Sequence, residues 1–192
     1  MYNIKGKSKA VIISDSAPLI DLCDIENGFA LLRKCFKPPV YIPAGVYEEV
    51  EHEEERAVLD SNVESGFVKV IDDFSNEELQ DIVDLLSSGL HKGESQAIAL
   101  IGTRFSRESS ELLIQDSDAI ERCRLRGIDT TGSLGIVLYA HKEKLISKKE
   151  AMKYIDDIAE ANIFIGGNKN LVRFVKGEVL KQERKLNKDM DL

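Results

Sequence analysis

The sequence predicts an α/β fold in which a mainly parallel central sheet is flanked by helices in three layers. Short apolar runs rich in β-branched residues recur along the chain, and such runs are typical of strands buried on both faces. Segments with the apolar spacing of helices separate these runs, and this alternation is the pattern of parallel α/β proteins. We expect strands over residues 10–14, 40–42, 67–71, 112–114 and 128–130.

Helix signals lie in the segments between the expected strands. Pro18 stands after the first strand, where the first turn of a helix tolerates a proline. Ser75 and Glu78 have the spacing of a capping box, so a helix is expected to begin directly after Ser75. Ser147 and Glu150 form a second pair with this spacing and predict the start of another helix.

The chain has the length and composition of one domain with a small appendage. Its 192 residues are 43% hydrophobic and 31% charged, which gives enough apolar material to bury a core. We expect a domain over residues 1–165 and a basic helical tail over residues 166–192, joined by the glycines Gly166 and Gly167. Residues 169–188 carry seven basic and two acidic side chains. The tail is therefore expected either to hold a nucleic-acid backbone or to be a solvated charged helix.

Composition and motifs exclude several classes of protein. No run of about 18 apolar residues occurs, so we expect no membrane-spanning helix. The apolar stretch near the N-terminus is too short for a signal peptide, and a reducing, cytoplasmic setting is expected. The three cysteines lack metal-like spacing, which argues against a zinc site of cysteine and histidine ligands. The sequence has no Walker A, GxGxxG or GxSxG motif, and its net charge of −8 argues against broad binding to DNA.

Two acidic residues follow expected strands, Asp15 after the first and Asp116 after the fourth. The carboxyl ends of parallel strands meet at one edge of a sheet, where ligands of this fold class bind. Carboxylates held close together at that edge are unfavourable unless a cation or hydrogen bonds neutralise them. Mg²⁺ or Mn²⁺ would do so and could activate a water for phosphodiester hydrolysis. Either acid could instead be an ordinary helix cap.

Five short motifs occur in one order along residues 11–145. They are IISDSAPLI, IPAGVYEEV, GESQA, LLIQDSDAIERC and TGSLG. In this order they resemble the PIN-like domain family, in particular an uncharacterised prokaryotic branch related to the VapC-like toxin ribonucleases of toxin–antitoxin pairs. The resemblance implies a PIN-like three-layer fold and a Mg²⁺- or Mn²⁺-dependent endoribonuclease, a hydrolase acting on RNA phosphodiesters.

The resemblance also implies a set of site residues. Four acids match the catalytic positions of the family, namely Asp15, Glu49, Glu94 and Asp116. Three of these acids would bind the metal: Asp15, Glu94 and Asp116. Four further residues are expected to surround and support the ligands: Ser16, Asp118, Thr131 and Ser133. The hydroxyl groups of Thr131 and Ser133 could hold a metal-bound water or a phosphate at a helix N-terminus.

Ordinary structural roles remain open for several of the acids. Glu49 lies in a run of glutamates, and such a run usually forms a solvated helix face. Glu94 would also be a first-turn acid favoured by the helix dipole, a role that is compatible with metal binding. Asp21, in the helix after the first strand, is a further residue that could support the ligands.

Three residues depart from the family pattern. Ala17 stands where Ser or Asn is usual, Gln96 where a second Glu is frequent, and Gln115 where a pair of Asp residues commonly begins. These departures leave open a catalytically weak module that binds RNA or a partner protein. A DNA nuclease of a mobile element or defence cassette is a third alternative.

The resemblance implies three partners for the chain. They are an RNA substrate, a small antitoxin protein that covers the acidic cleft, and a second copy of the chain in a homodimer. The apolar stretches 134–138 and 171–175 would be the exposed helix faces available for such a dimer.

Overall fold

The computed structural model describes residues 11–36, 39–162, 165 and 168–190, and of residues 184–190 the backbone alone. Its centre is a five-stranded sheet in which all neighbouring strands are parallel, in the order β3-β2-β1-β4-β5. The strands are β1 (Val11–Ser14), β2 (Val40–Pro43), β3 (Val68–Ile71), β4 (Ser110–Leu113) and β5 (Asp129–Thr131). Each expected strand is present with small shifts of its bounds, so the predicted α/β fold with a parallel sheet is confirmed.

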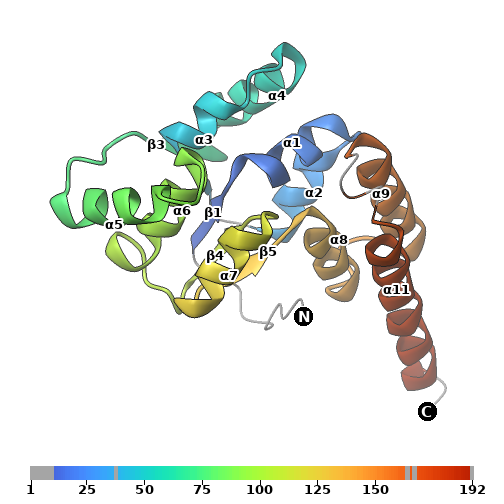
Figure 1. The fold of residues 1–192 in the computed structure, drawn as a ribbon. Helices are drawn as coiled ribbons and strands as arrows, with labels where there is room; N and C mark the ends of the chain where they lie inside the picture. The colour runs from blue at the N-terminus through green and yellow to red at the C-terminus, as the bar shows by residue number, and fades with distance from the viewer. Residues whose placement is uncertain (1–10, 37–38, 163–164, 166–167, 191–192) are drawn as a thin grey trace.

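Helices cover both faces of this sheet and complete the three layers (Figure 1). One face carries α1 (Ser16–Asp24), α2 (Gly28–Cys35), α8 (Ser133–Lys142), α9 (Lys148–Ala161) and α11 (Lys169–Met190). The other face carries α5 (Glu77–Ser87), α6 (Lys92–Thr103) and α7 (Ser117–Leu125). Two helices connect β2 to β3, namely α3 (Ala44–Glu49) and α4 (Glu53–Glu64).

Alternating side chains of the strands divide the core into two parts. Ile12 of β1 packs with side chains of α1, α2 and α8, whereas Ile13 packs with side chains of α5 and α6. Leu113 and Leu112 of β4 divide in the same way. Successive residues of a strand point to opposite faces, and here both faces are covered. The strands are therefore continuous apolar runs in the sequence, which is why the sequence alone located them.

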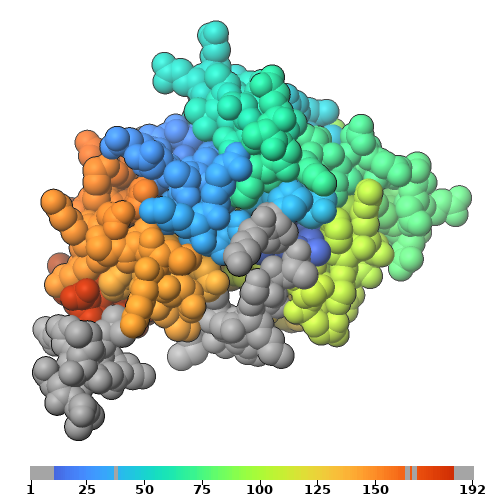
Figure 2. Space-filling model, turned by 180° about the vertical axis from the view of Figure 1, so that it is seen from behind, coloured from blue at the N-terminus to red at the C-terminus, as the bar shows by residue number. Residues whose placement is uncertain are grey.

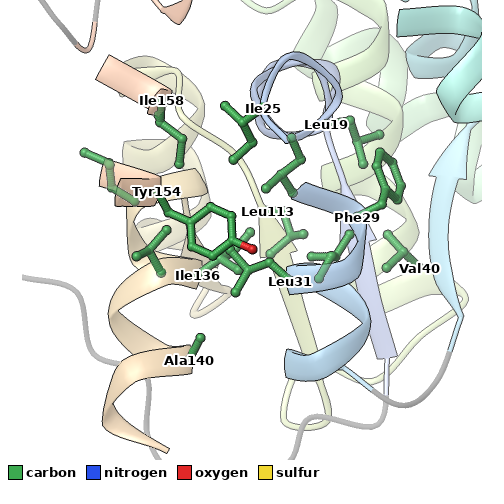
Figure 3. Close-up of a cluster of buried hydrophobic side chains, with 14 of the residues drawn as sticks. Leu19, Ile25, Phe29, Leu31, Val40, Leu113, Ile136, Ala140, Tyr154 and Ile158 are labelled. Atoms are coloured by element: carbon green, nitrogen blue, oxygen red, sulfur yellow. The ribbon is translucent and has the colours of Figure 1, made fainter. Parts of the chain in front are cut away.

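The larger part of the core lies between the sheet and the helices α1, α2, α8 and α9. Figure 3 shows Leu31 of α2 beside Leu113 of β4 and Ile136 of α8, with Tyr154 of α9 close by. The first three of these side chains are fully buried. From the opposite side, Figure 2 shows the α1–α2 segment (blue) between the α8–α9 segment (orange) and the α5–α6 segment (green). Because α1 and α2 lie at the centre of the molecule, the start of α1 is held in place there, and the candidate acid Asp15 directly precedes it.

The helix caps agree with the sequence at one of the two predicted boxes. At α9, Ser147 Oγ accepts the backbone N–H of Glu150 at 3.2 Å, and Glu150 Oε2 accepts that of Ser147 at 2.7 Å. At α5 the prediction is wrong by one residue, because Asn76 Oδ1 caps the helix by accepting a backbone N–H at 3.0 Å. Ser75 lies one residue before this cap, and its hydroxyl group donates to Asp73 Oδ1 at 2.7 Å.

The predicted dimer faces are largely used inside the chain. Leu134 is 2% exposed and Val175 is fully buried, so these parts of the stretches 134–138 and 171–175 contribute to the core. Phe174 remains exposed on α11. The expectation of exposure is therefore wrong for residues 134–138, because α8 is apolar around most of its circumference, as helices buried on several sides are, whereas residues 171–175 are buried only in part.

The C-terminal helix α11 packs on α9 and α8 through Val175 and Val179. The expected hinge at Gly166 and Gly167, and with it the boundary between the expected domain and tail, lies outside the described residues. Although α11 is 22 residues long, none of the helices in the described ranges is both long and apolar enough to cross a membrane.

We predict that Leu31→Ala lowers the free energy of unfolding by about 2–5 kcal/mol, because Leu31 is fully buried in the larger core. Leu125→Ala is the matched control, since Leu125 of α7 is 69% exposed. The control should change the free energy by less than about 0.5 kcal/mol. Urea denaturation of both variants measures the difference, and equal losses would contradict the assignment of the core.

Candidate active site

The order of the strands opens a crevice at the carboxyl edge of the sheet between β1 and β4. The chain crosses from β1 to β2 on one side of β1, and β4 pairs on the other side. Connections that leave two adjacent parallel strands in opposite directions create a gap between them, and ligands of open α/β sheets bind there. Asp15 directly follows β1, and its backbone N–H donates to the carbonyl oxygen of Leu113 at 2.8 Å. This bond holds the end of β4 next to Asp15. Asp116 follows three residues after Leu113, so the chain leading to it starts beside Asp15.

Asp15 is a buried carboxylate without a full set of partners. It is 3% exposed, and Oδ1 makes no hydrogen bond within the part of the chain that the structure describes. The pKa of Asp15 is raised to about 7, mainly by burial and also by the negative charges of Glu94 and Glu49, whereas the backbone N–H groups of Ser16 and Ala17 act in the opposite direction. An ionised carboxylate in such a place costs free energy unless a positive charge joins it.

Glu49 is anchored at both of its carboxylate oxygens. Oε2 accepts the hydroxyl group of Ser16 at 2.7 Å, and Oε1 accepts the backbone N–H of Gly93 at 3.1 Å. A Cβ atom at position 93 would lie 2.6 Å from Glu49 Oε1, so the close approach requires glycine there. These contacts tie α3 to the starts of α1 and α6. Glu49 therefore belongs to the site rather than to a solvated helix face.

Glu94 lies in the first turn of α6 and is 7% exposed. Its Oε2 atom accepts the backbone N–H of His91 at 3.0 Å. Burial raises the pKa of Glu94, the hydrogen bond from His91 lowers it, and the charges of Asp116 and Glu49 raise it. The structure thus brings the four acids predicted from the sequence into one electrostatically coupled cluster.

Asp116 is the exposed member of the cluster. It is the N-cap of α7, and its Oδ1 atom accepts the backbone N–H of Ala119 at 2.8 Å. The alternative role as a helix cap is therefore real, but it uses only one of the two carboxylate oxygens. Asp118, two residues further, is exposed in the first turn of α7.

The acids differ in how many of their carboxylate oxygens remain without a hydrogen bond and are therefore readily available to bind a cation. Asp15, Glu94 and Asp116 each keep one carboxylate oxygen with no hydrogen-bond partner within the described part of the chain, whereas Glu49 uses both. A hard cation that keeps several water ligands, such as Mg²⁺, suits a donor set of this kind. Among the described residues, no three His, Cys, Asp or Glu side chains stand close enough together to hold an ion directly. Waters or side-chain rotations would have to complete the coordination.

A second polar cluster lies beside the acids and is centred on Asp21. This carboxylate is 2% exposed. Its Oδ2 atom accepts the hydroxyl group of Ser133 at 2.6 Å and the amide of Gln115 at 2.9 Å, and its Oδ1 atom accepts the amide of Asn162 at 2.6 Å. The hydroxyl group of Ser133 is therefore held by Asp21. Sequence reasoning missed Asn162, because a single asparagine after a helix carries no signal of a contact with a residue so distant in the chain.

The departures from the family pattern have structural consequences. An acid at position 115 would place a carboxylate against that of Asp21, and Gln115 supplies an amide donor there. Gln96 Oε1 accepts the backbone N–H of Gly45 at 3.0 Å and so joins α6 to the start of α3. Thr131 is buried at the end of β5, and its Oγ1 atom has no hydrogen-bond partner among the residues described.

We predict that Asp15→Asn removes a pH dependence from the stability of the metal-free protein. The folded-state pKa of Asp15 is about 7 against an ordinary value of 3.8. The contribution of Asp15 is therefore complete below pH 3.8 and is lost as the pH rises to 7. Relative to Asp15→Asn, the wild type should lose on the order of a few kcal/mol between these pH values. Urea denaturation with a chelator present measures this, and parallel pH profiles of the two proteins would contradict it.

Comparison with known proteins agrees with this geometry. The family described as DUF3368, PIN domain, matches residues 11–176, which span the whole sheet and the helices up to the first part of α11. No curated protein sequence matches the chain. With a parallel sheet, an acid cluster at its carboxyl edge and a family match over most of its length, the chain belongs to the PIN domain family.

Proposed function

We propose that this protein is an endoribonuclease that uses Mg²⁺ or Mn²⁺ bound by acidic side chains. PIN domains are generally metal-dependent nucleases. The observation that carries the proposal is the buried carboxylate of Asp15, whose Oδ1 atom, at the carboxyl end of the central strand, has no hydrogen-bond partner among the described residues. In its ionised form, a carboxylate left in this state is unfavourable unless a cation neutralises it.

The four acids have different proposed roles in the site. The proposed metal ligands are Asp15, Glu94 and Asp116, since each keeps one carboxylate oxygen that no described residue engages. Glu49 is the proposed positioning acid, because Ser16 and the backbone of Gly93 hold both of its oxygens. The metal, when bound, would lower the pKa of a water and neutralise charge on the phosphate. The buried position of Asp15 and Glu94 excludes bulk water from one side of the site and strengthens these charge interactions.

RNA is the proposed substrate on the strength of the motif order. The body of the protein is acidic, with a net charge of −8 over the whole chain. A polyanion would therefore approach with the help of the cation and of basic groups such as Lys169 and Arg173, which are exposed at the start of α11. Comparing cleavage of single-stranded RNA with cleavage of single-stranded DNA would distinguish a ribonuclease from a DNA nuclease.

The motif order also supports a relation to the VapC-like toxins. On that reading, a small antitoxin protein covers the acidic crevice, and two copies of the chain form a homodimer. Phe174 and Leu180 are 53% and 39% exposed on α11, and they are the apolar side chains there that such a partner could cover.

A second candidate function is a catalytically weak module that binds RNA or protein. Gln115 favours it, because this residue is committed to the cluster around Asp21 and gives the metal site no additional acid. Folded wild-type protein without cleavage of any RNA, but with RNA binding, would support this candidate over the nuclease.

We predict that Asp116→Asn reduces Mn²⁺-dependent RNA cleavage by about 100-fold or more, because it removes a metal-binding charge and keeps the helix cap. Asp81→Asn is the matched control, since Asp81 is an exposed acid on α5. The control should cleave like the wild type. Unchanged cleavage by pure Asp116→Asn protein would show that the activity does not come from this site.

A further inference from the structure

A groove with a volume of about 620 Å³ lies along the seam between α9 and α11. The two helices pack side by side at the edge of the molecule (Figure 1). Six of the described lining residues come from α11: Lys169, Val172, Arg173, Lys176, Gly177 and Leu180. Residues spaced by three and four positions lie on the same side of a helix, so these six form one face of α11. We refer to this face and the adjoining end of α9 as the α9–α11 groove.

Basic side chains dominate the charge of the α9–α11 groove. Lys169 and Arg173 are exposed, and neither forms an ion pair with any residue that the structure describes. Lys176 is paired with Asp156 of α9, and Glu160 is the single acidic side chain among the described lining residues. The whole chain has a net charge of −8, so this face is a basic part of an acidic protein. A negatively charged occupant therefore fits the groove best.

Gly177 leaves the middle of the groove open. It lies inside the 22-residue helix α11, where a glycine destabilises the helix relative to alanine. A Cβ atom at position 177 would meet no atom within 4 Å, so packing within the described chain does not require a glycine there. The missing side chain gives an occupant of the groove room to approach the backbone of α11 closely.

The α9–α11 groove begins next to the candidate active site. Lys169 and Val172 line the groove, and their chain neighbours Asn168 and Leu171 line a cavity that also contains Asp116. The first turn of α11 therefore borders both spaces. A polymer whose reacting group lies at Asp116 can extend over this turn into the groove.

We propose that the α9–α11 groove binds the sugar–phosphate backbone of the RNA strand on one side of the cleavage point. The inference rests on the proposed nuclease function, which places a phosphate at the acids. Lys169 and Arg173 are separated by about 6 Å along the helix axis, close to the separation of successive phosphates in an extended strand. They would contact two neighbouring phosphates. The described lining residues include no aromatic side chain for stacking, so these contacts carry no base preference.

Two other occupants agree less well with the groove. In a two-fold symmetric dimer formed through this face, Lys169 and Arg173 of one copy would face the same basic groups of the other, and like charges repel. An acidic segment of a partner protein would match the charge, but it would not explain why the groove begins beside Asp116. An RNA strand accounts for both the charge and the position.

The test measures binding of a fluorescently labelled single-stranded oligouridylate to the metal-free full chain by anisotropy, at several KCl concentrations. A chelator prevents metal-dependent cleavage. The logarithm of the association constant falls linearly with the logarithm of the salt concentration, with a slope of about 0.7 for each phosphate contact on a single strand. Lys169→Gln/Arg173→Gln should therefore reduce the magnitude of this slope by about 1.4. An oligoadenylate of the same length should show the same reduction.

Two matched controls make the result specific to the groove. Lys142→Gln/Lys149→Gln removes the same charge from exposed lysines outside the groove and should keep the slope of the wild type. Gly177→Leu adds a neutral side chain in the open part of the groove and should weaken RNA binding several-fold. Asn170→Leu, at an exposed position of α11 outside the groove, should bind like the wild type.

Equal slope changes in the two double variants, or unchanged binding by folded Lys169→Gln/Arg173→Gln, would overturn the proposal. Unchanged binding by folded Gly177→Leu would also overturn it. Binding of an oligoglutamate peptide that depends on Lys169 and Arg173, without binding of oligouridylate, would refute it in favour of an acidic protein segment.

The outcome is separable from that of the nuclease assignment. Asp116→Asn should lose RNA cleavage and keep the dependence of RNA binding on Lys169 and Arg173. Groove-dependent binding by a wild type that cleaves no RNA with Mn²⁺ would refute the proposed nuclease and leave the groove as an RNA-binding surface. Metal-dependent cleavage by a wild type whose RNA binding does not depend on Lys169 and Arg173 would refute the groove and leave the nuclease.

Discussion

The carboxylate of Asp15 is the constraint on which the rest of the site depends. The strand order places β1 at the centre of the sheet, so the residue after it is enclosed on all sides and is 3% exposed. Burial and the charges of two neighbouring acids together raise its pKa to about 7. A fold gains no stability from such a group. Local costs of this kind concentrate at functional sites, where a ligand offsets them.

The surrounding residues fix the acids in place without neutralising them. Glu49 is held by a hydroxyl group and by the backbone of Gly93, and the absence of a Cβ atom at position 93 permits this approach. On the other side of the crevice, the network of Asp21 holds the loop after β4 through Gln115. These contacts are hydrogen bonds from neutral donors, so the cluster keeps its negative charge. The open crevice follows from the same strand order.

The sequence alone predicted the sheet and the positions of Asp15 and Asp116 at strand ends, because both depend on local patterns, whereas Glu49 and Glu94 were suggested by the family resemblance. Buried strands are continuous apolar runs, and Asp15 and Asp116 follow two of them. Contacts between distant residues carry no such local signal. The hydroxyl group of Ser133, expected near the metal, instead donates to Asp21, which lies 112 positions away. The apolar stretch 134–138, expected to be exposed, is buried mainly because α9 and α11 fold back over α8.

Calorimetric titration of Mn²⁺ into the purified protein tests the central claim most directly. The wild type should bind the ion saturably, and an Asp15→Asn/Asp116→Asn double variant should not. An Asp81→Asn/Asp84→Asn double variant on the exposed face of α5 removes the same charge and should bind like the wild type. Absence of binding in the folded wild type, or equal binding in all three proteins, would contradict a metal site between the ends of β1 and β4.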